Sequence, residues 1–168
     1  MRLAIPRPSL VVLIGPSGAG KSTFARKHFR RTEVLSSDFY RGLVADDESD
    51  QSATEAAFEV LRFIAARRLS AGRLTVVDAT SVQPRARQPL LALAFEHHVP
   101  AIAIVLQLPE DLCVARSQAR PARGVPAQIV RSQVRDLEGS LPGLGSEGFE
   151  AIYVLNTQDE VDCAVLAM

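Results

Sequence analysis

Five short apolar segments recur along the chain, and most of them are continuously hydrophobic instead of alternating with polar residues. Rich in Val, Ile and Leu, they cover residues 10–14, 33–36, 74–77, 101–106 and 151–155. Continuous apolar runs of this length are typical of strands that are covered on both faces, as in a parallel sheet. The pattern therefore predicts five buried, parallel strands.

The stretches between these segments repeat apolar residues at three- and four-residue spacing, which is the period of a helix. They cover residues 21–30, 51–70, 84–97 and 126–138. Strands alternating with helices predict a three-layer α/β domain with a parallel sheet flanked by helices. Residues 138–148 hold four glycines and one proline, so we expect a loop there. Near the chain end we expect a short helix with Asp159 at its N-cap.

Composition and charge narrow the class of protein. The 168 residues suit one domain, and the 47% hydrophobic and 23% charged content is ordinary for a soluble globular protein. Lys and Arg total 19, as do Asp and Glu, which excludes global attraction to nucleic acid but not a local basic patch. No apolar run approaches a membrane span, and no signal peptide is evident, so we expect a cytoplasmic protein with reduced thiols at Cys113 and Cys163.

Residues 15–22, GPSGAGKS, match the pattern G-x-x-x-x-G-K-[ST] between the first predicted strand and the first predicted helix. In such a loop the glycines let backbone N–H groups turn inward around phosphates, at the positive end of the helix dipole. Lys21 can reach the β and γ phosphates, and Ser22 can ligate Mg²⁺. The motif predicts a nucleoside triphosphate site, but it leaves GTPase, ATPase, transport motor and kinase open.

The second predicted strand is followed by Asp38 and, three residues later, Arg41. If a helical turn begins at Asp38, both side chains project from one face at the edge where an α/β sheet binds ligands. Asp38 could then accept the proton of an attacking hydroxyl while Arg41 grips a phosphate of the acceptor. The alternative is structural: Asp38 caps the next helix and pairs with Arg41.

The third predicted strand ends at Asp78, which is followed two residues later by Thr80. Asp78 could hold Mg²⁺ through water, as a Walker B carboxylate does, or it could orient Arg41 by an ion pair. A third possibility is that Asp78 or Thr80 caps a helix.

After the fourth predicted strand, residues 109–128 carry Arg116, Arg120 and Arg123 without an acidic residue between them. Arg116 and Arg120 have i, i+4 spacing, and a proline and a glycine interrupt the helical pattern. The segment is therefore a candidate for an arginine-bearing lid that closes on the β and γ phosphates. An exposed basic helix is the simpler alternative.

At this point four segments resemble a known family, the kinase domain of bacterial polynucleotide kinase-phosphatase, an RNA end-healing and repair enzyme. They are SLVVLIGPSGAGKSTFARKHF, EVLSSDFYRGLVADDESDQ, LTVVDAT and the arginine segment. The resemblance extends over nearly the whole chain. It implies an adenylate-kinase-like P-loop phosphotransferase that uses ATP and Mg²⁺ to phosphorylate 5′-hydroxyl ends of RNA or DNA.

The resemblance also implies roles for individual residues. Asp38 matches the general base, Arg41 the acceptor-phosphate contact, and Arg116 and Arg123 the lid arginines, whereas Arg120 matches less well. In related kinases an Asp followed two positions later by Thr or Asn closes the third strand, and Asp78-Ala79-Thr80 is similar. Asp78 is therefore expected, with Asp38 and Arg41, among the acceptor-binding residues. The residues expected to bind ATP, with Ser22 also on the metal, are Gly15, Ser17, Gly18, Ala19, Gly20, Lys21, Ser22, Thr23, Arg116, Arg120 and Arg123.

The family's kinase domain normally leads a longer polypeptide with phosphatase and ligase modules, and it is associated with an RNA 3′-end methyltransferase. We therefore expect residues 1–168 to be the N-terminal domain of a longer chain. Homo-oligomerisation stays open. Two other functions compete with this one: a small-molecule kinase on the same scaffold, and a nucleotide-dependent switch without an acceptor.

Overall fold

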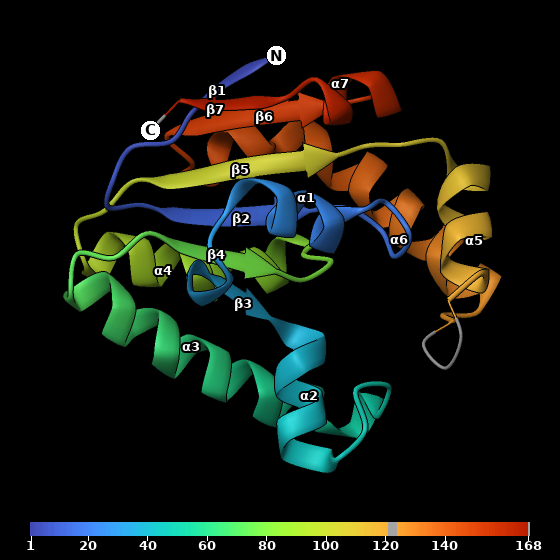
Figure 1. Ribbon diagram of the computed structural model, residues 1–168, viewed down its shortest axis with the longest axis horizontal. Coiled ribbons are helices and arrows are strands. Elements are labelled where there is room, and N and C mark those ends of the chain that lie inside the picture. Colours follow the sequence, from blue (N-terminus) through green and yellow to red (C-terminus); the bar gives the residue numbers. More distant parts are fainter. Residues whose placement is uncertain (121–123, 168) are drawn as a thin grey trace.

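The computed structural model describes residues 1–120 and 124–167. Its centre is a sheet of order β3-β4-β2-β5-β6 in which every neighbouring pair is parallel (Figure 1). The strands are β2 (Leu10–Ile14), β3 (Val34–Ser36), β4 (Thr75–Asp78), β5 (Ala101–Leu106) and β6 (Ala151–Leu155). The five predicted strands are thus confirmed, with ends that differ by at most one residue.

Helices connect these strands. They are α1 (Lys21–His28), α2 (Ser37–Ala45), α3 (Thr54–Ser70), α4 (Pro84–Glu96), α5 (Glu110–Gln118), α6 (Ala127–Ser140) and α7 (Gln158–Asp162). Short 3₁₀ turns cover η1 (Arg31–Glu33), η2 (Gln51–Ala53) and η3 (Leu141–Ser146). The four predicted helices are confirmed as α1, α3, α4 and α6.

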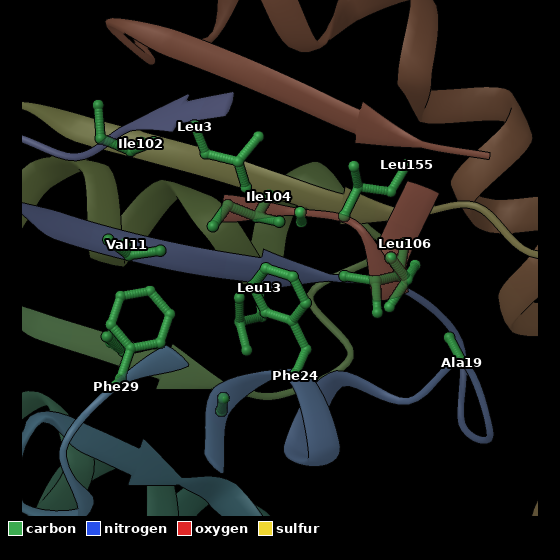
Figure 2. Packing of buried hydrophobic residues seen from close by; sticks show 14 of the residues in the cluster. Leu3, Val11, Leu13, Ala19, Phe24, Phe29, Ile102, Ile104, Leu106 and Leu155 are labelled. Atoms are coloured by element: carbon green, nitrogen blue, oxygen red, sulfur yellow. The ribbon is translucent and has the colours of Figure 1, made fainter. Parts of the chain in front are cut away.

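Alternate residues of β2 point into two separate cores, which makes the fold three-layered. Val11 and Leu13 pack on the side of α1, where Phe24 is also buried (Figure 2). Val12 packs on the opposite side, with Leu61 of α3 and other apolar residues of α3 and α4. The predicted α/β class, a parallel sheet covered by helices on both faces, is therefore confirmed.

Two sequence-based expectations about the C-terminal third are wrong. The glycine-rich residues 138–148 are not simply a loop: α6 continues to Ser140 and η3 follows it. Leu144 is buried in the core and holds this turn, while a side chain at Gly139 or Gly143 would point into open space. The glycines therefore lie on the open side of a helical segment, where they do not break it.

The N-cap of α7 is Thr157, not Asp159. The Thr157 hydroxyl accepts a hydrogen bond from the Glu160 backbone N–H at 3.2 Å, and Glu160 accepts one in return from the Thr157 N–H. This capping box leaves Asp159 in the first turn, where its charge faces the positive end of the helix dipole.

Two short strands were not identified from the sequence. β1 (Arg2–Ala4) pairs in parallel with β7 (Val165–Ala167), and Leu3 is fully buried against the main core. Three-residue strands leave too short a pattern to recognise. Cys113 and Cys163 are both free thiols. Within residues 1–120 and 124–167, no helix combines the length and hydrophobicity needed to cross a membrane.

Candidate functional site

The carboxyl ends of β2, β3 and β4 meet at one edge of the sheet. The parallel register sets Asp78 beside both Ser36 and Leu13, so the segments that follow these strands converge. A cleft of about 570 Å³ opens there. The predicted site residues that line it are Ser17, Lys21, Ser22, Asp38, Arg41, Asp78 and Arg120.

The phosphate-binding loop (P-loop), residues 15–22, is shaped by glycines in left-handed backbone conformations. Gly18 has a φ of 83° and Gly20 a φ of 92°, which side-chain-bearing residues rarely adopt. A Cβ on Gly18 would lie 2.0 Å from the carbonyl oxygen of Cys113 in α5, so only glycine allows this close approach. Ala19 is buried in the core and offers the site only its backbone.

Lys21 is held inside the P-loop. Its Nζ donates hydrogen bonds to the carbonyl oxygens of Gly15 and Pro16, both at 2.8 Å, and the residue is only 7% exposed. Burial lowers the pKa of the Lys21 amine to about 8, and the negative charge of Asp78 partly opposes this shift. The amine is therefore held in place by two carbonyl oxygens, and the negative charge of Asp78 compensates its positive charge only in part.

Ser22 and Asp78 contact each other directly. The Ser22 hydroxyl donates a 2.6 Å hydrogen bond to Asp78 Oδ2, and Asp78 is almost fully buried. The other two possibilities for Asp78 are wrong, because Arg41 pairs with a different carboxylate and α4 begins at Pro84 after the N-cap residue Gln83. The pair thus has the composition of a magnesium site built from a hydroxyl and a carboxylate.

The two oxygen ligands that Ser22 and Asp78 offer suit Mg²⁺ better than a metal ion that needs a complete set of protein ligands. Residues 1–120 and 124–167 contain no cluster of three or more His, Cys, Asp or Glu side chains that could hold an ion. Mg²⁺ is commonly bound by one or two protein oxygens, several waters and the substrate phosphates, and it does not need such a cluster. Ser22 and, through water, Asp78 are therefore the residues that could hold it.

Asp38 and Arg41 form an ion pair on α2, and both residues line the cleft. The expected helical turn is confirmed, and Ser36, not Asp38, is its N-cap: Ser36 Oγ accepts a hydrogen bond from the Phe39 N–H at 3.3 Å. Arg41 Nη2 bonds Asp38 Oδ1, and Arg41 Nε donates to the Glu48 carbonyl oxygen at 2.9 Å. The Nη1 group of Arg41 donates to no described residue and remains available to an anion.

The arginine segment distributes its side chains differently from the expectation. Arg116 lies on α5, outside the cleft lining, and its Nη2 donates to Gln158 Oε1 at 2.9 Å. α5 ends at Gln118, so Arg120 does not share its helical face; Arg120 is exposed after the helix and lines the cleft. Arg123 lies outside the described residues.

Thr23, which follows the P-loop and was expected to bind ATP, points away from the cleft. It is exposed on α1 and does not line the cleft, and its hydroxyl accepts a hydrogen bond from Arg26 Nη2 at 3.3 Å. Ser17, by contrast, lines the cleft and makes a contact that the sequence did not suggest.

That contact is with Gln133 of α6. Gln133 Oε1 accepts a 2.8 Å hydrogen bond from the Ser17 backbone N–H, and Gln133 also lines the cleft. A glutamine in an amphipathic helix, 116 positions further along the chain, carries no sequence signal for such a role. Only the packing of α6 beside the P-loop brings it there.

A buried arginine supports the P-loop indirectly, through the loop between β4 and α4. Arg87 is fully buried, and its guanidinium makes two hydrogen bonds to Glu147, at 2.7 and 2.5 Å, and one to the Ser81 carbonyl at 2.8 Å. The adjacent Thr80 carbonyl accepts a 2.9 Å hydrogen bond from the Gly15 N–H. Arg87 therefore anchors the loop between β4 and α4 that holds the first residue of the P-loop.

The chain matches a known family model over most of its length. A family model described as an AAA domain, AAA_33, matches residues 10–144, which covers most of the chain. No protein in the curated set is similar enough in sequence to match.

Solved structures show the same fold at low sequence identity. The AvrRxo1-ORF1:-ORF2 complex with ATP has a TM-score of 0.70 and 13% identity over 90% of this chain and 55% of that chain. Shikimate kinase from Acinetobacter baumannii, in complex with shikimate, has a TM-score of 0.52 and 20% identity over 92% and 88%. Both share the α/β fold of this chain, and the second is a kinase by name.

A third structure is more similar in sequence over a shorter stretch. The Pnkp1/Rnl/Hen1 complex has a TM-score of 0.57 and 28% identity, over 66% of this chain and 39% of that chain. This chain thus spans about half, or less, of the chains that it matches in the AvrRxo1-ORF1:-ORF2 and Pnkp1/Rnl/Hen1 complexes.

Proposed function

Because the chain belongs to the AAA domain family of nucleotide-binding proteins and has a kinase-like P-loop fold, we propose that it is an ATP-dependent polynucleotide 5′-hydroxyl kinase. The proposed reaction transfers the γ-phosphate of ATP to 5′-hydroxyl ends of RNA or DNA. The 28% identity to a chain of the Pnkp1/Rnl/Hen1 complex supports this acceptor over others.

The observation that carries the proposal is the placement of the Asp38 and Arg41 pair. It lines the same cleft as Lys21, so one wall can hold the donor phosphates while the other receives the acceptor. A carboxylate beside a guanidinium suits an acceptor whose hydroxyl lies next to a phosphate. The terminal nucleotide of a strand has that chemistry, with a 5′-hydroxyl and a phosphate on its 3′ side.

Asp38 is proposed to act as the general base. Arg41 engages its Oδ1, which leaves Oδ2 to accept the proton of the 5′-hydroxyl as that oxygen attacks the γ-phosphorus. The bond from the γ-phosphorus to the ADP oxygen breaks as the new P–O bond forms, in line with it. Arg41 Nη1 is available to bind the neighbouring phosphate and so align the hydroxyl.

On the donor side, Lys21 is proposed to exchange its two carbonyl partners for the β and γ phosphates. Arg120 lines the cleft, where it can add positive charge. Arg116, which donates to Gln158 outside the cleft lining, and Arg123 are proposed to contact ATP phosphates only because the family resemblance implies it. Mg²⁺ on Ser22 and, through water, Asp78 would neutralise charge on the β and γ oxygens during transfer.

The proposal includes the partners that the family resemblance implies. These are 5′-hydroxyl RNA or DNA ends, phosphatase and ligase modules, and an RNA 3′-end methyltransferase. The name of the Pnkp1/Rnl/Hen1 complex supports an assembly of this kind for that protein, of whose chain this one covers 39%.

The test is transfer of label from γ-labelled ATP to 5′-hydroxyl oligonucleotides. Wild type is expected to label RNA or DNA ends, and Asp38→Asn to lose about 10²- to 10⁴-fold in turnover with little change in ATP affinity. Asp159→Asn is the matched control, because Asp159 is exposed and outside the cleft. Loss of both ATP binding and transfer in Asp38→Asn would make Asp38 a structural residue.

The competing functions predict different results in the same assay. A cleft of about 570 Å³ also suits a small metabolite, as the fold shared with shikimate kinase suggests. Labelling of sugars or hydroxy acids, with none of oligonucleotides, would favour that small-molecule kinase. ATP binding without acceptor-dependent turnover would favour a nucleotide switch.

A further inference from the structure

Gln133 is a cleft residue for which the proposed mechanism has no role. It reaches the P-loop from α6, whose buried residues Val130, Val134 and Leu137 fix the helix against the core. A second tie, a 2.8 Å hydrogen bond from Gln83 Nε2 to Asp136 Oδ2, fastens α6 to the loop that follows β4. Gln133 therefore extends from a rigid support.

The hydrogen bond between Gln133 and Ser17 shows which part of the P-loop Gln133 contacts. Ser17 N–H and the Pro16 carbonyl belong to one peptide group, because they flank the same peptide bond. That group donates its N–H to Gln133 and accepts from Lys21 Nζ through its carbonyl oxygen. Since a P-loop lysine reaches the β and γ phosphates, this peptide group lies beside those phosphates, at the end of the phosphate cradle that is away from the nucleoside.

The chemistry of the carboxamide fixes its orientation. The Ser17 N–H can only donate, so the atom that faces it must be the Gln133 oxygen, and the NH₂ group must face away. This NH₂ group carries two N–H donors, and neither has a partner among the described residues. A phosphate oxygen in the cleft would satisfy them.

We propose that Gln133 recognises the terminal phosphate of a bound triphosphate: its oxygen holds the peptide group between Pro16 and Ser17, and its NH₂ donates to a γ-phosphate oxygen. ADP lacks that phosphate, so the NH₂ group gains a charge-assisted hydrogen bond only from ATP. Gln133 thereby helps the site to distinguish substrate from product. The inference rests on the nucleotide-binding part of the proposed function and does not depend on the acceptor.

The test compares Gln133→Glu with wild type. A glutamate of the same shape still accepts from Ser17 N–H, but it cannot donate and it repels the phosphate. Affinities for ADP and for a non-hydrolysable ATP analogue with an imido β–γ bridge are measured by calorimetry. The variant is expected to lose about tenfold to a hundredfold more affinity for the triphosphate analogue than for ADP.

Gln128→Glu is the matched control, since Gln128 is exposed on the same helix and does not line the cleft. It is expected to leave the ratio of the two affinities unchanged. Gln133→Leu, which removes both polar atoms at similar volume, should also reduce the preference for the triphosphate. Circular dichroism verifies that each variant is folded.

An equal loss of affinity for both nucleotides would overturn the inference and leave Gln133 as a structural tie between α6 and the P-loop. An unchanged ratio in Gln133→Glu would overturn it as well. The end-labelling assay separates the two proposals: wild type that labels no oligonucleotide, while Gln133→Glu still loses triphosphate preference, refutes the acceptor assignment and supports this one.

Discussion

The cleft has a donor wall, formed by the P-loop, and an acceptor wall, formed by α2, and the two walls present different kinds of chemical group. The donor wall, residues 15–22, presents mainly backbone groups, and its shape depends on Gly18 and Gly20 in left-handed conformations. The acceptor wall presents side chains on α2, where the Asp38 and Arg41 ion pair is held by a serine cap and one carbonyl contact. The side chain of Asp38 is 37% exposed, whereas Lys21 is a buried residue.

This difference teaches how such a site divides its tasks. A backbone cradle binds phosphates and says little about the acceptor, since any triphosphate offers it the same oxygens. Side chains on a separate helix can change while the cradle stays intact, so the acceptor wall carries the specificity. Damage to the donor wall should therefore abolish nucleotide binding, while damage to the acceptor wall should affect the acceptor alone.

The largest expected effect comes from the support behind the donor wall. Arg87→Ala leaves Glu147 without its buried partner and frees the Ser81 carbonyl, so we expect a loss of about 3–5 kcal/mol in the free energy of unfolding, measured in urea. ATP affinity should fall too, because the neighbouring Thr80 carbonyl holds Gly15. Arg85→Ala, an exposed arginine on the same helix, should stay within about 0.5 kcal/mol of wild type. Similar stability of the two variants would contradict the role of Arg87.

The acceptor wall should respond selectively. Arg41→Ala is expected to raise the KM for a 5′-hydroxyl oligonucleotide about tenfold to a hundredfold, with the KM for ATP nearly unchanged, because it removes a contact to one acceptor phosphate. Steady-state kinetics with each substrate varied in turn measures both values. Arg31→Ala, an exposed arginine outside the cleft, is the control. An acceptor KM that stays at the wild-type value would refute the assignment of Arg41.

The pH dependence of nucleotide binding tests the lowered pKa of Lys21 in the donor wall. With a pKa of about 8 in the free protein, Lys21 must take up a proton above pH 8 to meet the phosphates, so ATP affinity should fall by up to about tenfold per pH unit there. Stability should move the other way: the unfolded chain keeps this proton up to about pH 10.5, so the folded state gains stability between pH 8 and 10.5. Calorimetry in buffers of different ionisation enthalpy measures the uptake, and its absence at pH 9 would contradict the lowered pKa.

The smallest expected effect concerns the cap of the acceptor helix. Ser36→Ala removes the hydroxyl that accepts from Phe39 N–H and should cost about 1 kcal/mol in the free energy of unfolding, measured by thermal or urea denaturation. Ser36→Asp should restore most of it. If Ser36→Ala reduced the affinity for the acceptor as much as Arg41→Ala does, then the position of α2, and not only its side chains, would determine acceptor binding.

Much of the donor wall was predictable because its signals are local. The glycines, Lys21 and Ser22 lie within eight consecutive residues, and strand β2 before them is continuously apolar. The i, i+3 pair of Asp38 and Arg41 was predictable for the same reason, since one turn of helix brings them together. The glycine-rich stretch 138–148 was misjudged because tertiary packing of Leu144 holds a helical turn there. The cap at Thr157 was missed although its signal is local, since Thr157 and Glu160 form a capping box three residues apart.

Short-range stereochemistry thus settled the strand pattern, the P-loop and the helix that carries Asp38, because each depends on neighbouring residues and on backbone conformations open only to certain side chains. Contacts between distant positions needed the folded chain. Ser22 meets Asp78, Gln133 meets Ser17 and Arg87 meets Glu147 only after strand register and helix packing bring those elements side by side. Hydrogen bonds of about 3 Å demand that precision, and no periodicity along a sequence encodes it.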